Sequence, residues 1–198
     1  MERFCVSKGG HSFQLWGAVP VAPAIRKNIQ RVEWLVRFDR NCAYELLGAD
    51  RKDWNKGGGV SFATSVLSKE MFDNHTDAAM WGWRYNPHTG LVELTAYCHI
   101  DGKRPFLKYN PYASAKGLKD GEVCLEVGFN QAAKIVLEVD WENKTYRFTF
   151  HIHSTTAKYP VGVAFNHGKR WGRLIGLWFG GNNSAPQKMD VFLSRHIE

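Results

Sequence analysis

Side chains suited to binding a ligand lie in four separate segments of this sequence. They donate and accept hydrogen bonds, with one tryptophan among them, and the ligand that such a set fits is a hydroxyl-rich sugar. Glycines beside them would let the backbone approach the ligand closely. The candidate ligand-binding residues are Asn55, Lys56, Trp83, Arg84, Tyr97, His99, Gly181, Asn182 and Asn183.

The segment Gly180–Pro186 reads GGNNSAP and joins two strand-like stretches. Its glycines permit a positive φ and leave backbone N–H groups free to face a ligand or an anion. Asn182, Asn183 and Ser184 add donors and acceptors for hydroxyl groups. The other interpretation is a loop that only closes the fold, which is the commoner role of such a segment.

Asn55 and Lys56 precede three consecutive glycines, Gly57–Gly59. The G-x-x-x-x-G-K-[ST] spacing of a phosphate-binding loop is absent and no helical pattern follows, so nucleotide binding is disfavoured. Glycines at the start of a strand favour a bulge or a strand crossing. Close approach of a ligand to the backbone is the alternative.

Trp81, Trp83 and Tyr85 alternate with other residues, so their rings share one face of a strand. Such a stripe is core more often than binding platform, because burying large rings drives sheet packing. If a ring is exposed instead, it would stack on a sugar, and Arg84 could hold an anionic substituent through a bidentate contact. The sequence leaves both interpretations open.

No catalytic cluster is evident, and no catalytic residue is predicted. Glycoside hydrolysis needs two carboxyl groups about 5 to 10 Å apart, and the E-x-D-x-x-E pattern of a sandwich glucanase does not occur. A lyase needs a Tyr or His base and a group that neutralises the substrate carboxylate. Tyr97, His99, Arg84 and His151 could supply these groups only if the fold brings them together.

No metal site and no cofactor is predicted. The four cysteines show neither C-x-x-C spacing nor a short Cys/His knot, which favours reduced, partly buried thiols. His75 and Asp77 could be ligands or an acid and base. Two nearby polar groups in a loop are, however, typical of solvated turn residues.

Period-two alternation, typical of strands with one buried face, runs through most of the chain. Val32–Phe38 and Thr145–His153 show it most clearly, with apolar and polar side chains on opposite faces. Helical periodicity is scarce and is confined to short candidates at Ser68–Asn74 and Ala113–Leu118. The chain is therefore expected to be nearly all β.

Two strand pairs are expected along the chain. Leu91–Ile100 ends at Asp101-Gly102, a favoured hairpin turn, so a further strand is expected from Lys103. Glu122–Phe129 and Lys134–Asp140 are expected to form another pair.

About ten to twelve such strands predict a two-sheet antiparallel sandwich of the jelly-roll or concanavalin-like kind. A lipocalin-type barrel is the alternative. No repeat or Pro/Ser-rich linker divides the 198 residues. Residues 1–198 are therefore interpreted as a single domain, of which residues 1–11 could form a flexible N-terminal arm.

The formal net charge of +7 would attract acidic polymers without giving specificity. The densest basic groupings are pairs only, at Arg26-Lys27, Lys103-Arg104 and Lys169-Arg170, which disfavours nucleic acid as a partner. The N-terminus lacks the pattern of a secretory signal, and no stretch reaches the roughly 18 apolar residues of a membrane span. A cytoplasmic or virion-associated protein is expected.

Four segments carry a resemblance to a known group: DWNKGGGVSF from Asp53, MWGWRYN from Met80, LVELTAYCHIDGKR from Leu91 and GGNNSAPQKMDVFL from Gly180. They resemble a little-characterised group of single-domain, jelly-roll-like proteins of Bacteroidetes and the phages that infect them. The resemblance implies mainly a fold. Gln187 and Lys188 stand where that group's ending has His and Asp, which argues against metal or proton chemistry there.

The leading hypothesis is a non-catalytic, lectin-like carbohydrate-binding module, with acidic glycans as one class of ligand. The alternative is a virion decoration or fibre-associated protein of a phage, with other virion proteins or copies of itself as partners. A polysaccharide lyase or hydrolase is the third hypothesis.

Overall fold

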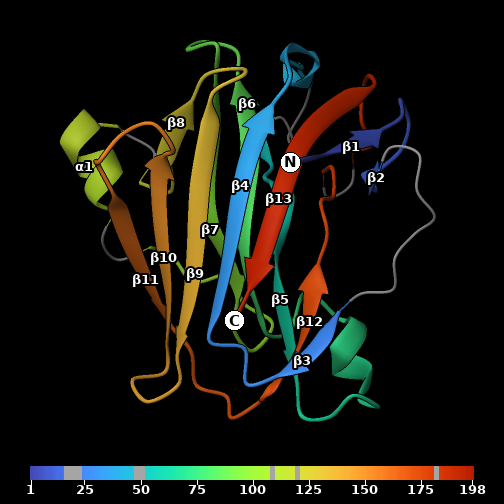
Figure 1. The fold of residues 1–198 in the computed structure, drawn as a ribbon, viewed down its shortest axis with the longest axis vertical. Coiled ribbons are helices and arrows are strands. Elements are labelled where there is room, and N and C mark those ends of the chain that lie inside the picture. Colours follow the sequence, from blue (N-terminus) through green and yellow to red (C-terminus); the bar gives the residue numbers. More distant parts are fainter. Residues whose placement is uncertain (16–23, 47–51, 108–109, 119–120, 181–182) are drawn as a thin grey trace.

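The computed structural model describes residues 1–15, 24–46, 52–107, 110–118, 121–180 and 183–198. These residues form two antiparallel sheets packed face to face, which confirms the predicted two-sheet sandwich (Figure 1). The seven-stranded sheet has the order β11 (Tyr159–Ala164), β10 (Thr145–Ile152), β9 (Ala132–Asp140), β4 (Arg31–Phe38), β13 (Met189–Ile197), β1 (Glu2–Val6) and β2 (Gln14–Leu15). The six-stranded sheet has the order β3 (Ile25–Lys27), β12 (Trp171–Ile175), β5 (Asn55–Ala63), β6 (Ala78–Asn86), β7 (Leu91–His99) and β8 (Leu125–Val127).

The predicted alternation sets which side chains enter the core. In β4, Val32, Trp34, Val36 and Phe38 are buried, while the residues between them are only half-buried. In β10, the aromatic residues of the alternating series are fully buried in the same way: Tyr146, Phe148 and Phe150. The core is therefore a layer of inward-facing rings and branched side chains between the two sheets.

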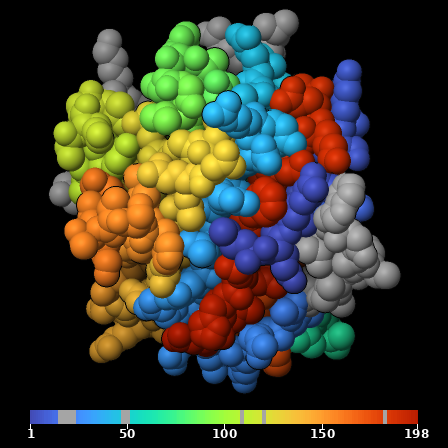
Figure 2. Space-filling model, turned by 45° about the horizontal axis from the view of Figure 1, so that its top comes forward, coloured from blue at the N-terminus to red at the C-terminus, as the bar shows by residue number. Residues whose placement is uncertain are grey.

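The N-terminal segment is a paired strand rather than the flexible arm that the sequence suggested. β1 pairs with β13, with Phe4 opposite Val191, and its other edge pairs with β2. The N-terminal and C-terminal segments accordingly lie against each other in Figure 2, where they are blue and red. The side chain of Arg3 adds a two-point contact, with Nε and Nη2 at 3.0 and 2.9 Å from the Asp190 carboxylate.

The expected strand at Lys103 does not form. Asp101 and Gly102 do make a turn with positive φ at both residues, of 51° and 73°, but only an isolated bridge joins Ile100 to Lys103. The partner of β7 on that side is β8, which contributes Leu125 opposite Leu94. The turn at Asp101-Gly102 was predicted correctly. The strand that pairs with β7, however, is β8, which lies further along the chain.

The second expected pair is also wrong. β8 belongs to the six-stranded sheet, while β9 lies in the other sheet between β4 and β10. The chain crosses between the sheets at residues 128–131, where Asn130 has a φ of 62°. A turn between two strands thus marks a change of sheet here instead of a hairpin.

The short helical candidates are confirmed. The 3₁₀ helix η3 (Lys69–Phe72) begins after Ser68, whose side chain accepts a hydrogen bond from the backbone of Glu70. The helix α1 (Pro111–Lys116) is capped by Asn110 and ends at Gly117 with a φ of 63°. A further 3₁₀ turn, η1 (Arg40–Cys42), follows β4. Within the described residues, no helix is long and apolar enough to cross a membrane.

The triple glycine forms the bulge that the sequence favoured. The register between β5 and β6 shifts between Lys56 and Gly58. A Cβ atom at Gly57 would lie 2.0 Å from the ring of Trp81, which is fully buried. Glycine is therefore required because an indole occupies the space that a side chain would need.

Replacing Gly57 by Ala is expected to lower the free energy of unfolding by about 1–3 kcal/mol, because the buried indole of Trp81 has no space into which to move. Urea denaturation measures the loss. Gly121→Ala is the matched control, since nothing lies within 4 Å of a Cβ at that position. Equal stabilities for the two variants would contradict this account of the bulge.

Candidate functional site

Four of the predicted site residues share the outer face of the six-stranded sheet. Lys56 lies opposite Gly82, Met80 opposite Tyr97, and Arg84 opposite Glu93. Directly opposed residues of antiparallel strands project to the same side. His99 follows Tyr97 by two residues and joins this face. The alternation of β6 and β7 thus brings Lys56, Arg84, Tyr97 and His99 onto one surface.

Trp83 belongs to the core and is not a binding ring. It is 0% exposed, and its ring centroid lies 5.0 Å from that of Phe38 in the opposite sheet. Tyr44 and Phe179 pack edge-on against it at 6.0 and 6.3 Å. The expectation that Trp83 contacts a ligand was wrong, because its large apolar surface is buried between the sheets.

Asn55 is buried as well and acts as a structural bridge. Its side-chain N–H donates to the Tyr44 hydroxyl at 2.8 Å, and its carbonyl oxygen accepts from the backbone of Gly180 at 2.6 Å. With 1% exposure, it has no surface for a ligand. Both the NH₂ and the carbonyl of its side-chain amide form hydrogen bonds inside the protein, and the residue holds the start of the Gly180 loop in place.

The Gly180 loop docks against β5. Gly180 has a φ of 67°, and a Cβ there would lie 2.1 Å from the backbone oxygen of Asn183. The Lys56 ammonium donates to the Gly180 carbonyl at 3.3 Å. Asn183 is half-buried. The other two predicted residues of this loop, Gly181 and Asn182, lie outside the described residues.

Arg84 is engaged by the protein itself. Its Nε donates to the Glu93 carboxylate at 2.6 Å, and Nη1 donates to the Lys52 carbonyl at 3.0 Å. The guanidinium also lies 4.1 Å from the centroid of the Trp54 ring. Arg84 therefore contacts an internal carboxylate, whereas the sequence had allowed a bidentate contact with an anionic ligand if a neighbouring ring were exposed.

Aromatic rings and charges alternate across this face. We call Trp54, Arg84, Tyr97, Arg104 and Glu122 the outer-face ladder. Trp54 Nε1 donates to Glu122 at 3.2 Å, and Arg104 Nη2 donates to the same carboxylate at 2.8 Å. The Arg104 guanidinium lies 4.4 Å from the Tyr97 ring centroid. Cation–π contacts and charge-assisted hydrogen bonds hold the ladder rigid.

Lys56 lies beside the ladder without a carboxylate partner among the described residues. Its Nζ is 5.5 Å from the Tyr97 ring centroid. Burial lowers the pKa of Lys56, with the negative charge of Asp53 opposing that shift. Burial likewise raises the pKa of Tyr97. The pair offers a desolvated ammonium and a neutral phenol side by side.

Sequence reasoning missed Trp178. It forms a bridge opposite Lys56, is 41% exposed and stacks on His11 with ring centroids 5.3 Å apart. It lies two residues before Gly180, so proximity to the glycine-rich loop was the only signal in the sequence. An exposed indole next to an ammonium is a feature of many ligand-binding surfaces.

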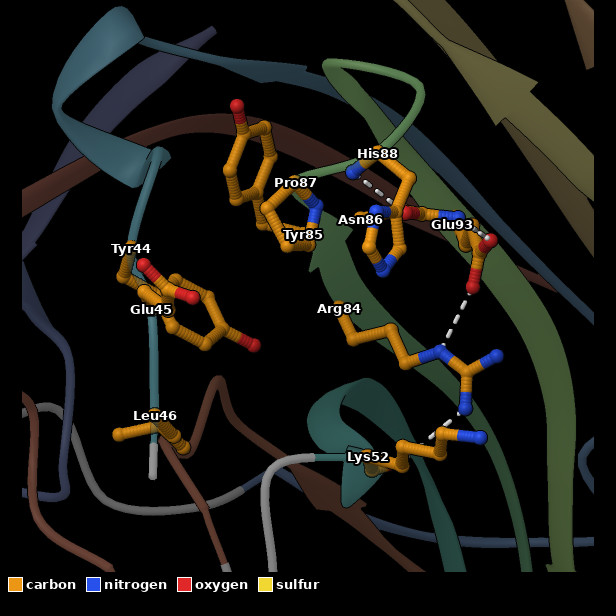
Figure 3. Close-up of a pocket in the computed structure, with 10 residues that line it drawn as sticks. All are labelled: Tyr44, Glu45, Leu46, Lys52, Arg84, Tyr85, Asn86, Pro87, His88 and Glu93. Atoms are coloured by element: carbon orange, nitrogen blue, oxygen red, sulfur yellow. Dashed lines mark hydrogen bonds and ion pairs between the residues drawn. The ribbon is translucent and has the colours of Figure 1, made fainter. Parts of the chain in front are cut away.

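A pocket of about 570 Å³ lies at the end of the sandwich where β6 turns into β7. We call it the β6–β7 pocket. Figure 3 shows the segment of Tyr44 and Leu46 on one side and Arg84 with Glu93 on the other. Its lining residues are Tyr44, Glu45, Leu46, Lys52, Arg84, Tyr85, Asn86, Pro87, His88 and Glu93. Of these, only Arg84 was predicted as a site residue.

The polar groups of the β6–β7 pocket are held in place by one another. Asn86 Nδ2 donates to Glu93 at 2.7 Å, on the oxygen that Arg84 Nε leaves free. Burial raises the pKa of Tyr44 to about 12, so its hydroxyl stays protonated. Tyr85 stacks on Phe129 with centroids 5.7 Å apart. The pocket thus combines two tyrosine rings with a fixed polar wall.

The four residues that could have served a lyase do not form one set. His151 lies on β10 in the other sheet, whereas Tyr97, His99 and Arg84 lie on the six-stranded sheet. His99 itself is buried, and its Nδ1–H donates to the Asn74 carbonyl at 2.9 Å. No group of three or more His, Cys, Asp and Glu that could hold a metal ion occurs in the described part of the chain.

Comparisons with known proteins add little to this geometry. No family model matches the chain, and no curated protein matches it. Among solved structures, the chain is similar to a functionally unknown protein from Saccharomyces cerevisiae. The two share 10% sequence identity with a TM-score of 0.48, over 99% of this chain and 87% of that chain.

The free energy of unfolding is expected to fall as the pH drops below about 6.5. Burial lowers the pKa of His99, so the unfolded chain takes up a proton before the folded chain does. The stability that neutral His99 contributes is present above its unfolded pKa and is lost as the pH falls toward the folded value. Urea denaturation at about pH 7.5 and about pH 5.5 measures the loss.

His99→Gln should make this loss smaller, because the substituted residue does not titrate. The exposed His153 supplies the control, and His153→Gln should lose as much stability as the unaltered protein. A loss of the same size in His99→Gln and in the unaltered protein would show that burial of His99 has no part in it.

Proposed function

We propose that this protein is a non-catalytic carbohydrate-binding β-sandwich whose ligand occupies the β6–β7 pocket. The observation that carries the proposal is the composition of that pocket: tyrosine rings opposite a wall of hydrogen-bonded polar groups. Sugars present both an apolar ring face and a rim of hydroxyl groups. A pocket with apolar walls and a few fixed polar groups suits both parts.

Each wall of the pocket has a defined part in this proposal. Tyr85 offers a half-buried ring on which a sugar ring can stack. Asn86 and Glu93 are held by their mutual hydrogen bond and offer their remaining acceptors and donors to hydroxyl groups. Because these side chains are already ordered, a ligand loses little further conformational entropy on binding.

The charges in the pocket favour a neutral sugar unit there. Arg84 is paired with Glu93, and the exposed Glu45 and Lys52 carry opposite charges. The two acidic residues therefore balance the charges of the two basic residues in the lining. Neutral hydroxyl groups of a ligand fit such a pocket better than an anionic group does. The net charge of +7 still attracts an acidic polymer to the protein as a whole.

Tyr85→Ala is expected to weaken binding of a neutral oligosaccharide about fivefold to tenfold, because the stacking surface is lost. A glycan array of neutral and acidic oligosaccharides identifies the ligand, and calorimetry measures its Kd for each variant. His88→Ala, at an exposed rim position, tests the same pocket without disturbing the core.

Phe106→Ala is the matched control, since this ring is 87% exposed and does not line the pocket. It should bind as the unaltered protein does. Absence of binding to every glycan on the array, or equal losses in Tyr85→Ala and Phe106→Ala, would overturn the proposal.

A structural role in a larger particle is the second candidate. It is favoured by apolar side chains that η3 and the residues before it expose: Leu67 is 92% exposed and Phe72 is 67% exposed. Val66 lies in the same short segment and is also exposed. Clustered exposed apolar residues commonly mark protein–protein contacts.

This second candidate predicts self-association through that segment. Light scattering coupled to size-exclusion chromatography should give an oligomer, and the double variant Leu67→Ser, Phe72→Ser should be monomeric. A monomeric unaltered protein that binds a soluble glycan would count against it.

A further inference from the structure

Two basic pairs that are far apart in the sequence lie side by side in the fold. β3 pairs with β12 so that Lys27 is opposite Trp171 and Arg26 is opposite Gly172. The backbone of Asn28 donates to the Arg170 carbonyl at 2.9 Å. The pairs Arg26-Lys27 and Lys169-Arg170, which are isolated in the sequence, therefore lie on adjacent backbone segments at one edge of the sheet.

Two of these cations form cation–π contacts with indole rings. The Lys27 ammonium is 5.7 Å from the Trp171 ring centroid, and the Arg170 guanidinium is 4.3 Å from that of Trp141. Trp141 is itself fixed, since its Nε1 donates to the Ile29 carbonyl at 3.1 Å. Cation–π contacts hold the positive charges in defined positions on the surface.

Three of these four cations form no ion pair within the described part of the chain. Lys169 is used internally, at 3.0 Å from Glu70 and 2.8 Å from Asp77. Arg26, Lys27 and Arg170 are exposed and form no ion pair with a described carboxylate. We call these three residues, with Trp171 and Trp141, the basic end.

A shallow pocket lies beside these charges. Its volume is about 360 Å³. Its lining residues are Ile25, Arg26, Lys27, Asn28, Ile29, Trp171 and Glu198. Glu198 is the one acidic residue in this lining, and its carboxylate lies 3.4 Å from His196. The lining therefore combines apolar side chains with two cationic side chains and one acidic one.

Charged residues on an edge strand also have a simpler use. β3 is the edge strand of its sheet, and lysine or arginine on such an edge prevents pairing with other chains. That role requires only that the charge be exposed. It does not require an indole beneath the cation, a second basic pair from another strand, or a pocket between them.

We propose that the basic end binds an anionic polysaccharide, with sulfate or carboxylate groups on Arg26, Lys27 and Arg170 and a sugar ring in the adjoining pocket. The guanidinium groups can contact oxyanions through two parallel hydrogen bonds. The exposed amide of Asn28 and the side chain of Ile25 offer contacts for a hydroxyl group and for an apolar ring face.

The arrangement favours a polysaccharide over a nucleic acid. Single-stranded nucleic acids bind through stacking of bases on exposed rings. Here a cation lies over one face of each indole, which leaves less ring surface for a base to stack on. Duplex binding relies on many phosphate contacts along a broad basic surface. The basic end supplies only three cations that lack an ion pair with a described carboxylate, and Glu198 lies beside them.

The basic end is separate from the β6–β7 pocket. Figure 1 shows β3 at one end of the sandwich and the tip of β6 at the other. Neither pocket shares a lining residue with the other. The two surfaces can therefore be tested independently.

The experiment measures binding of dextran sulfate and of carboxymethyl dextran by calorimetry at several salt concentrations, with neutral dextran as the uncharged reference. In the triple variant Arg26→Gln, Lys27→Gln, Arg170→Gln, the affinity for the anionic polymers should fall about tenfold or more. The slope of log K against log salt concentration should also be smaller by about 2 to 3.

The control removes the same charge elsewhere, through Lys8→Gln, Lys116→Gln and Lys158→Gln at exposed positions. It should change the affinity less than about twofold, because long-range attraction is screened by salt. Equal losses in the two triple variants would overturn the proposal, since net charge alone would then explain binding. Tighter binding of single-stranded or duplex DNA than of dextran sulfate at the same sites would also overturn it.

A measurement on the unaltered protein avoids any effect of the substitutions on folding. In ¹H–¹⁵N spectra, titration with sulfated dextran oligomers should shift the indole N–H signal of Trp171 and leave that of Trp54 in place. Shifts spread evenly over the surface would refute a site at the basic end. Tyr85→Ala should retain dextran sulfate binding, so failure of the pocket proposal and failure of this one are distinguishable.

Discussion

Trp81 and Trp83 fill the space between the two sheets, and their size dictates how the surrounding strands are arranged. Trp83 meets Phe38 of the opposite sheet, while Trp81 occupies the volume above Gly57 and forces the bulge in β5. Two fully buried indoles remove a large apolar area from water. The bulge in turn brings Asn55 to the inner side, where it joins Tyr44 to the Gly180 loop.

Because the indoles face inward, the alternate residues of β6 must face outward. Arg84 and Met80 lie on that side, next to Glu93 and Tyr97 of β7. Several of these outer residues are covered by loops, and their charges are matched within the protein, as for Arg84 with Glu93. A surface that looks polar and available in the sequence is therefore largely a rigid scaffold. Open space is left where β6 turns into β7 and at the edge strand β3.

The strands were predictable from sequence because period-two alternation is a local property, as Val32–Phe38 shows. The partners of those strands were not. β8 pairs with β7 rather than with β9, since pairing depends on which apolar faces the whole chain can bury together. The same limit applies to the site. Lys56, Tyr97 and Arg84 lie on one face through strand pairing that the sequence left open, and two other candidates, Trp83 and Asn55, are buried.

By itself, the sequence determined the fold class and the places of the short helices, because alternation and helical periodicity are properties of neighbouring residues. Only the tertiary structure decided which polar side chains form hydrogen bonds or ion pairs within the protein and which can contact a ligand. It pairs Arg84 with Glu93, and it joins Arg26-Lys27 to Arg170 across the β3–β12 edge. The physical reason is that ion pairing and pocket shape depend on distances between side chains. Those distances are set by the pairing of strands that are remote in the sequence.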